Sequence, residues 1–154
     1  MENLKKFYGT YKGLIGEYIF KLSRKFIILT KLTNKERILD YFNEMLNEKQ
    51  RKFLETYWHS IDALEFKKNK QEIILYEIKT KNAFKNKIYK PKMTKHTHKV
   101  YNNAKKLGFV VKLAFVKLHN NWNFDIQELE FNQKYYYIDS PKRFDKEVGS
   151  GLKY

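Results

Sequence analysis

The stretch at residues 60–79 constrains the fold more than any other part of the chain. It contains two runs rich in apolar residues, joined by a polar turn at Lys68-Asn69, and this pattern is typical of a β-hairpin. Side chains alternate between the two faces of a strand. The residues that share one face of the second strand are Ile73, Leu75, Glu77 and Lys79. Both faces are largely apolar, which predicts a strand inside a sheet that is covered on both sides.

The charged end of this apolar face is explained by the predicted hairpin register. A loop with an even number of residues, centred on the polar turn, places Asp62 opposite Leu75 and therefore on the face of Glu77 and Lys79. Asp62 and Glu77 become diagonal neighbours, with backbones about 7–8 Å apart. Two carboxylates at this separation can hold one divalent cation. A loop with an odd number of residues would move Asp62 to the other face.

The charge of the chain favours a polyanionic partner. Lys and Arg number 32 against 17 Asp and Glu, which gives a net charge of +15. This excess is larger than solubility requires and makes nucleic acid, with DNA first, the leading candidate. The alternative is a lysine-rich or heat-adapted surface without such a partner. The chain of 154 residues suits a single domain over residues 1–154.

Several classes of site and location are excluded or disfavoured by composition. The chain has no Cys, so disulfides and thiolate metal sites are excluded. The longest apolar runs are too short to span a bilayer, and no apolar run follows the N-terminus, which predicts a cytoplasmic protein without membrane association.

An amphipathic helix is predicted at residues 11–26, before the hairpin. Its apolar residues recur at spacings of three and four and are Leu14, Ile15, Tyr18, Ile19, Leu22 and Phe26. Glu17 lies at the edge of this stripe. Gly13 and Gly16 leave room there for another backbone or a phosphate to come close. Residues 26–29 suit either a short strand or a continuation of this helix.

The rest of the pattern alternates between helices and strands. Thr33 and Glu36 have the spacing of a capping box and predict a long helix after them, and Gly108 marks the end of another. The further predicted elements are a helix at 33–57, a basic loop at 81–92, a helix at 93–107, strands at 109–118 and 124–131, and a flexible tail at 132–154. This order predicts an α/β domain, an α+β mixed sheet flanked by helices.

Asp62, separated by fourteen residues from Glu77-Ile78-Lys79, resembles the signature of the PD-(D/E)XK nuclease superfamily, which includes archaeal Holliday-junction resolvases and RecB-like exonucleases. Many members have a Glu on the first helix that completes the metal site, and Glu17 matches it. The resemblance covers residues 11–118 and implies a restriction-endonuclease-like core with a helical insertion at 33–57.

Two positions depart from the family pattern. Ile61 stands where the family name has Pro, and Thr97 stands where several subfamilies carry Gln, with Tyr101 at the position of their Tyr. The subfamily is therefore left open.

The resemblance implies metal-dependent hydrolysis of phosphodiester bonds. Asp62 and Glu77 would hold Mg²⁺ or Mn²⁺, helped by Glu17 and the backbone carbonyl of Ile78, and Lys79 would orient the attacking water. Exonuclease and endonuclease action both remain open, as do DNA and RNA substrates, and members that cut two strands commonly form homodimers. The surrounding lysines expected to bind phosphates are Lys81, Lys85, Lys87, Lys95, Lys99 and Lys105.

Two alternatives compete with this interpretation. The first is a basic module that binds nucleic acid without cutting it, on the same fold. The second is a solvated hairpin end at which Asp62, Glu77 and Lys79 form weak surface pairs. His96 and His98 are two apart on a predicted helix and cannot share a metal. A surface or packing role is expected for all four histidines, and His98 is the best of them for a contact with DNA.

Overall fold

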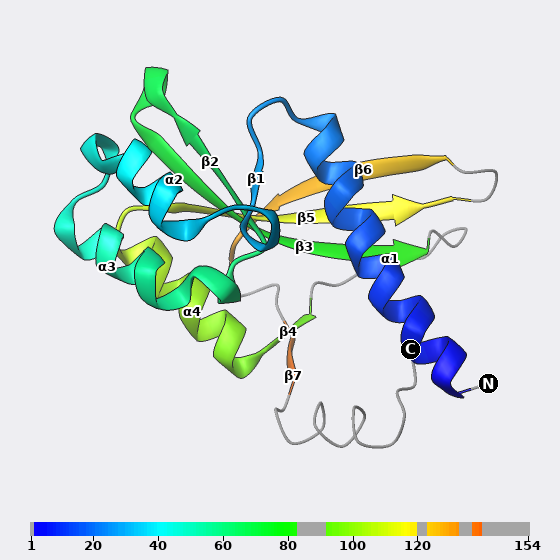
Figure 1. Cartoon of the computed structure of the whole chain (residues 1–154). Helices are drawn as coiled ribbons and strands as arrows, with labels where there is room; N and C mark the ends of the chain where they lie inside the picture. The colour runs from blue at the N-terminus through cyan, green and yellow to red at the C-terminus, as the bar shows by residue number, and fades with distance from the viewer. Residues whose placement is uncertain (1, 83–91, 120–122, 133–136, 140–154) are drawn as a thin grey trace.

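The computed structural model describes residues 2–82, 92–119, 123–132 and 137–139 (Figure 1). Most of the predicted basic loop and of the C-terminal tail lies outside the described residues. The helices are α1 (Glu2–Ser23), α2 (Lys35–Tyr41), α3 (Glu48–Tyr57) and α4 (Lys95–Lys106). The strands are β1 (Ile28–Leu29), β2 (Ala63–Lys67), β3 (Glu72–Asn82), β4 (Lys92–Thr94), β5 (Val110–Leu118), β6 (Phe124–Glu130) and β7 (Tyr137–Asp139).

A five-stranded mixed sheet lies at the centre, with the order β1-β2-β3-β5-β6. Strands β3 and β5 are parallel, whereas the other neighbours in this sheet are antiparallel. Strands β4 and β7 form a separate parallel pair. Figure 1 shows α1 crossing the sheet at β3 and β5, with α2, α3 and α4 grouped apart from it. This arrangement confirms the predicted α/β class.

Two apolar clusters cover the two faces of the sheet. One contains Leu64 and Leu75 together with residues of α2, α3 and α4. The other contains Ile74 and Tyr76 together with Phe20 of α1. The alternation predicted along the hairpin is therefore confirmed, because neighbouring residues of β3 enter different clusters. No helix in the described part of the chain has the length and apolarity needed to cross a membrane.

The predicted hairpin register is wrong by two residues. Leu64 lies opposite Leu75, and the turn is a short 3₁₀ turn over Lys68–Lys70 that is closed by Gln71 in the left-handed conformation, with φ of 51°. The loop is therefore centred beyond the polar pair. Because the shift is even, every side chain keeps its face. Asp62 directly precedes Ala63, the first paired residue of β2, so this register places it opposite Glu77 instead of Leu75.

The single long helix predicted at residues 33–57 is also wrong. The chain forms α2 and α3, separated by a 3₁₀ turn at Asn43–Met45. Asn34, and not Thr33, caps α2 by accepting a hydrogen bond from the Arg37 amide. A second cap starts α3, where Asn47 and Gln50 satisfy each other's backbone amides in a capping box. A new helix therefore begins where the sequence suggested that the first one continued.

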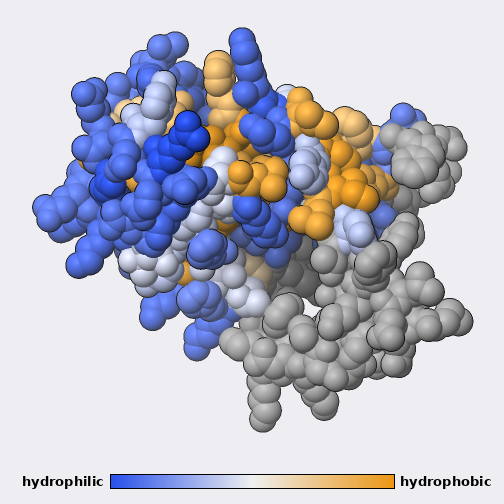
Figure 2. Space-filling view, in the orientation of Figure 1, coloured by the Kyte–Doolittle hydropathy of each residue, from blue (hydrophilic) through white to orange (hydrophobic). Residues whose placement is uncertain are grey.

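The predicted N-terminal helix exists, but its apolar stripe is not the face that packs on the sheet. Tyr18 is 49% exposed and Leu22 is 84% exposed, whereas Gly16 and Phe20 are buried. Figure 2 shows hydrophobic side chains gathered over the part of the surface that α1 crosses. The packing face is set by Gly16, where an added Cβ would lie only 1.7 Å from the Thr80 Oγ1. The missing side chain lets α1 approach β3 closely.

Replacing Gly16 should therefore destabilise the fold, although alanine favours a helix. We expect Gly16→Ala to lower the free energy of unfolding by about 1–3 kcal/mol through overpacking against Thr80. Gly13→Ala is the matched control, because an added Cβ there meets nothing within 4 Å, and it should raise stability by about 0.5–1 kcal/mol. Urea unfolding measures both changes. Two stabilising substitutions would contradict the close approach of α1 to β3.

Candidate functional site

The hairpin brings Asp62, the residue directly before β2, close to Glu77 on β3. Ala63, the first residue of β2, pairs with Tyr76, and continuing this register by one residue places Asp62 opposite Glu77. The backbone amide of Ile78 donates a hydrogen bond of 2.8 Å to the Asp62 Oδ2. This bond fixes the Asp62 carboxylate against β3, next to Glu77.

Glu77 is held by one partner at each carboxylate oxygen. Glu77 is only 8% exposed. The Tyr101 hydroxyl, on α4, lies 2.8 Å from the Glu77 Oε2 and 3.1 Å from the carbonyl oxygen of Tyr76. The Lys79 ammonium lies 3.3 Å from the Glu77 Oε1, because residues two apart on a strand share a face. The predicted neighbours Asp62, Glu77 and Lys79 are thus brought together.

Tyr101 was not among the predicted site residues. The signal for it was its spacing from Thr97, which matches the Gln-x-x-x-Tyr pattern found in several subfamilies of the nucleases that the sequence resembles. In the structure Thr97 belongs to the helix cap: its amide donates to the Thr94 Oγ1 at 3.2 Å, and the two hydroxyls are 2.9 Å apart. Thr94 caps α4 in this way, while Tyr101, one turn further on, reaches Glu77.

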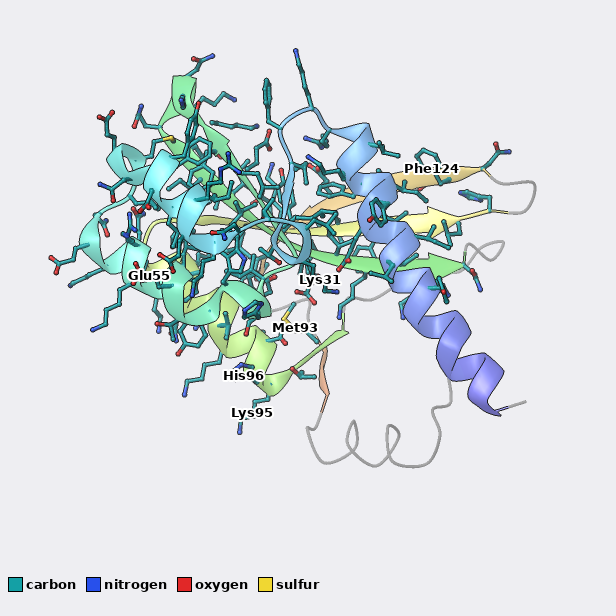
Figure 3. The ribbon with its side chains drawn as sticks, in the orientation of Figure 1. Lys31, Glu55, Met93, Lys95, His96 and Phe124 are labelled. Carbon is teal, nitrogen blue, oxygen red and sulfur yellow. The ribbon has the colours of Figure 1, made fainter. Side chains whose placement is uncertain are left out.

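Lys31 is the second residue that sequence reasoning missed. Its ammonium lies 3.0 Å from the Oε1 of Glu17, the acid on α1 that is 8% exposed. Lys31 belongs to a 3₁₀ turn, Thr30–Leu32, directly after β1. Figure 3 marks it near the middle of the molecule, where α1 crosses the sheet. No local sequence motif indicates a role for Lys31, because the residues that it interacts with come from distant parts of the chain.

The turn that carries Lys31 is fastened to the segment that carries Asp62. The Thr30 amide donates to the Asp62 carbonyl at 3.2 Å, and the Thr30 hydroxyl donates to the Ile61 carbonyl. The buried indole of Trp58 donates to the Thr30 carbonyl at 3.2 Å. These bonds set the position of Lys31 relative to the two acids of the hairpin.

Charge interactions connect Asp62, Glu77 and Glu17, and they also act on Lys31. Burial raises the pKa of Asp62 well above its usual value, and the negative charges of Glu77 and Glu17 raise it further; the Ile78 amide and the Lys79 charge oppose this change. For Lys31, burial lowers the pKa, but the hydrogen bond and charge of Glu17 and the charges of Asp62 and Glu77 produce a net rise. All three carboxylates therefore act on Lys31.

The donor chemistry fits a hard cation at two carboxylates. Mg²⁺ is commonly held by one or two carboxylates together with water molecules, and the opposed Asp62 and Glu77 offer this set. Among the residues that the structure describes, no three His, Asp or Glu side chains are grouped as metal ligands. Glu17 instead pairs with Lys31. The Ile78 amide is engaged with Asp62, and a role for the Ile78 carbonyl stays a prediction.

Two of the histidines, His98 and His119, have side-chain contacts that the structure identifies. His119 lies 2.5 Å from the Asp125 carboxylate at the end of β5 and β6. The ring of His98 packs on Phe131, with 5.2 Å between the ring centroids. Both arrangements agree with the packing or surface roles expected for these residues.

Comparison with known proteins adds no relative: the sequence matches no family model and no curated protein.

The raised pKa of Asp62 predicts a gain in stability when its charge is removed. A folded-state pKa above the unfolded value contributes stability that is present at low pH and lost as pH rises through the folded pKa. Asp62→Asn keeps an oxygen that can accept from Ile78 but carries no charge. We expect this variant to be more stable than the parent at pH 7 without divalent metal, and to lose part of the parent's pH dependence above pH 3.8, the ordinary value of an aspartate.

Urea unfolding in EDTA across this pH range measures the effect. Asp40→Asn is the matched control, because Asp40 pairs with Arg51 on the surface at 2.6 Å and should change stability little or lower it slightly. A loss of stability in Asp62→Asn at pH 7 would contradict the repulsion between the opposed acids.

Proposed function

We propose that the protein is a metal-dependent nuclease that hydrolyses phosphodiester bonds of nucleic acid, with DNA as the first candidate substrate. The observation that carries this proposal is the closeness of Asp62 and Glu77. Asp62 continues the β2–β3 register to the position opposite Glu77 and accepts from the Ile78 amide, and Lys79 pairs with Glu77. Two acids at such close range repel each other unless a cation lies between or beside them. The pattern resembles the PD-(D/E)XK superfamily in residue type and in order.

The fold order supports a restriction-endonuclease-like core. A helix, α1, precedes three antiparallel strands, and α4 then connects β3 to the parallel strand β5. Asp62 directly precedes the second of these strands and Glu77 lies on the third. Helices α2 and α3 stand between β1 and β2, in the place of the expected insertion.

The residues of the site have separable roles in the proposed reaction. Asp62 and Glu77 would hold Mg²⁺ or Mn²⁺, with Glu17 and the Ile78 carbonyl as further ligands by resemblance. A metal bound there would supply polarisation of the phosphoryl oxygen and stabilisation of the leaving oxygen. The Ile78 amide and the Tyr101 hydroxyl orient the two carboxylates, so that neither has to reorganise when substrate arrives.

Lys79 is the proposed partner of the attacking water. Its ammonium is close to Glu77, and its side chain is 31% exposed, so it can be reached from solvent. An ammonium in this position donates hydrogen bonds to a water molecule and to a non-bridging phosphate oxygen, and its charge offsets the negative charge that develops there. Glu77 keeps the lysine on the side of the acids.

A non-catalytic nucleic-acid-binding module is the second candidate. The observation in its favour is that Glu17 and Glu77 already have ammonium partners, Lys31 and Lys79. Lysine can thus provide much of the positive charge that a metal would bring, while the net charge of +15 still favours a polyanion. Cleavage of nucleic acid is the property that distinguishes the nuclease from the non-catalytic module.

Cleavage should depend on Glu77 and Lys79. We expect Glu77→Ala and Lys79→Ala each to lower the rate at least about 100-fold, since general acid-base and electrostatic groups contribute factors of this size. Labelled single-stranded, duplex and branched DNA, and single-stranded RNA, would be incubated with Mg²⁺, Mn²⁺ or EDTA. Glu44→Gln, at an exposed position of the turn after α2, is the matched control and should cut like the parent.

Circular dichroism would establish that each variant is folded. The enzyme proposal fails if the parent cuts none of these substrates with either metal. It also fails if both alanine variants cut as well as the parent. Retained binding without any cleavage would favour the non-catalytic module.

Lys31 should compete with a metal for the charge of the acids. Removing the Lys31 ammonium takes away a positive charge that offsets the repulsion among the three carboxylates. We expect Lys31→Met to unfold at a lower temperature than the parent in EDTA, and to gain more from added Mg²⁺. Lys49→Met, on the exposed side of α3, should leave both quantities unchanged. Thermal unfolding with a Mg²⁺ titration measures them, and an equal gain in parent and Lys31→Met would contradict the competition.

A further inference from the structure

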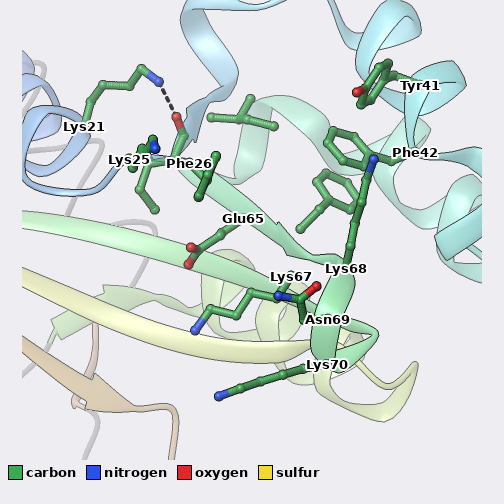
Figure 4. Close-up of a pocket in the computed structure, with 13 residues that line it drawn as sticks. Lys21, Lys25, Phe26, Tyr41, Phe42, Glu65, Lys67, Lys68, Asn69 and Lys70 are labelled. Carbon is green, nitrogen blue, oxygen red and sulfur yellow. Dashed lines mark hydrogen bonds between the residues drawn. The ribbon is translucent and has the colours of Figure 1, made fainter.

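A second candidate site lies at the tip of the hairpin, away from the acids. It is a pocket of about 680 Å³ between the end of α1, the end of α2 and the β2–β3 turn (Figure 4). Its lining includes neither Asp62 nor Glu77. It exists because β1 pairs with β2 only at Ala63 and Leu64. Beyond this pairing the two chain segments separate, and the space between them opens beside Glu65 to Lys67.

The pocket is strongly cationic. Five lysines line it against a single acid, Glu65. These lysines are Lys21, Lys25, Lys67, Lys68 and Lys70. They come from two segments, and Figure 4 shows Lys67 and Lys70 extending along the pocket from the hairpin while Lys68 turns toward Tyr41 and Phe42. None of the five is among the lysines that the sequence pattern suggested for phosphate binding. Charge complementarity points to an anionic ligand.

Exposed aromatic rings accompany these lysines. Tyr41 is 71% exposed and Phe26 is 65% exposed, so neither is explained by packing in the core. Phe42 stacks on Phe66 with ring centroids 3.9 Å apart and planes at 2°. The Lys68 ammonium lies 5.0 Å from the Tyr41 ring centroid. Flat, accessible rings beside cations are the surfaces on which single-stranded bases stack.

Glu65 restricts how a ligand can lie in the pocket. The residue is 8% exposed and accepts a hydrogen bond of 3.0 Å from the Tyr76 hydroxyl. Its negative charge repels a phosphate from the inner wall, so phosphates belong at the lysine rim. The same carboxylate can accept hydrogen bonds from the ring or amino N–H groups of a base. A base inside and phosphates outside satisfy both requirements.

The distribution of the lysines favours a strand over a free nucleotide. They are spread over two chain segments, which suits successive phosphates along a backbone. We propose that this pocket binds a single-stranded segment of nucleic acid, with bases stacked on Tyr41 and Phe26 and phosphates held by Lys67 and Lys70. This binding is independent of cleavage at Asp62 and Glu77 and requires no metal.

The test is the affinity of the full chain for a short, fluorescently labelled oligothymidine in EDTA, measured by anisotropy over a range of salt. Lys67→Gln with Lys70→Gln should weaken binding and reduce the slope of log affinity against log salt by about 1.4, the value for two contacts with a single strand. Tyr41→Ala should weaken binding about tenfold with little change in slope, because a stacked base is lost.

Matched controls separate the pocket from overall charge and hydrophobicity. Lys49→Gln with Lys52→Gln removes the same charge from exposed positions of α3. Phe124→Ala removes an aromatic residue that is 50% exposed on β6. Both controls should bind the oligothymidine like the parent. Equal losses in the control and pocket variants, or no loss in either, would overturn the proposal.

Competition experiments test the class of ligand. A poly-glutamate peptide that competes as well as unlabelled oligothymidine would overturn the assignment to nucleic acid, and a mononucleotide that competes equally would overturn the assignment to a strand. If the pocket variants lose binding and the parent does not cleave, the pocket proposal is supported and the nuclease proposal is rejected. If the parent cleaves and the pocket variants bind like the parent, the nuclease proposal is supported and the pocket proposal is rejected.

Discussion

The hydrogen bond from the Ile78 amide to the Asp62 carboxylate holds together a pair of groups that would otherwise separate. Across β2 and β3, Asp62 and Glu77 repel each other in surroundings where burial already disfavours charge. The structure compensates with directed partners: Tyr101 and Lys79 for Glu77, and the backbone for Asp62. Such an arrangement costs stability in the absence of a cation, and preorganised acids of this kind occur at functional sites more than elsewhere.

The position of α1 depends on the same region. Gly16 allows the helix to approach Thr80, and the residue after it, Glu17, is thereby turned toward the sheet and buried. A larger residue at position 16 would move Glu17 outward and separate it from Lys31. Lys31 is in turn positioned by the bonds of Thr30 to the carbonyls of Ile61 and Asp62, directly before β2. The packing of α1 at Gly16 thus positions Glu17, and the backbone bonds of Thr30 position its partner, Lys31.

The sequence was sufficient for relations that depend on local periodicity. The faces of β3 followed from alternation, and Asp62 came to the face of Glu77 because an even shift in register preserves it. The register itself depended on Gln71, whose left-handed backbone no local pattern indicated. Tyr101, Lys31 and the pocket depend on contacts between segments distant in the chain. The break between α2 and α3 required choosing between competing caps, which propensity alone does not decide.

The hairpin also fixes the spacing of the two proposed sites. Asp62 directly precedes β2 and Lys67 is its last residue, and at about 3.3 Å per residue they are separated by about 17 Å along the chain. A nucleic acid with about 3.4 Å per nucleotide covers this distance with about five nucleotides. A strand bound in the pocket could therefore present a phosphodiester bond to the acids only if it continued for this length. The length of β2 therefore determines how far from a held end the bond would lie.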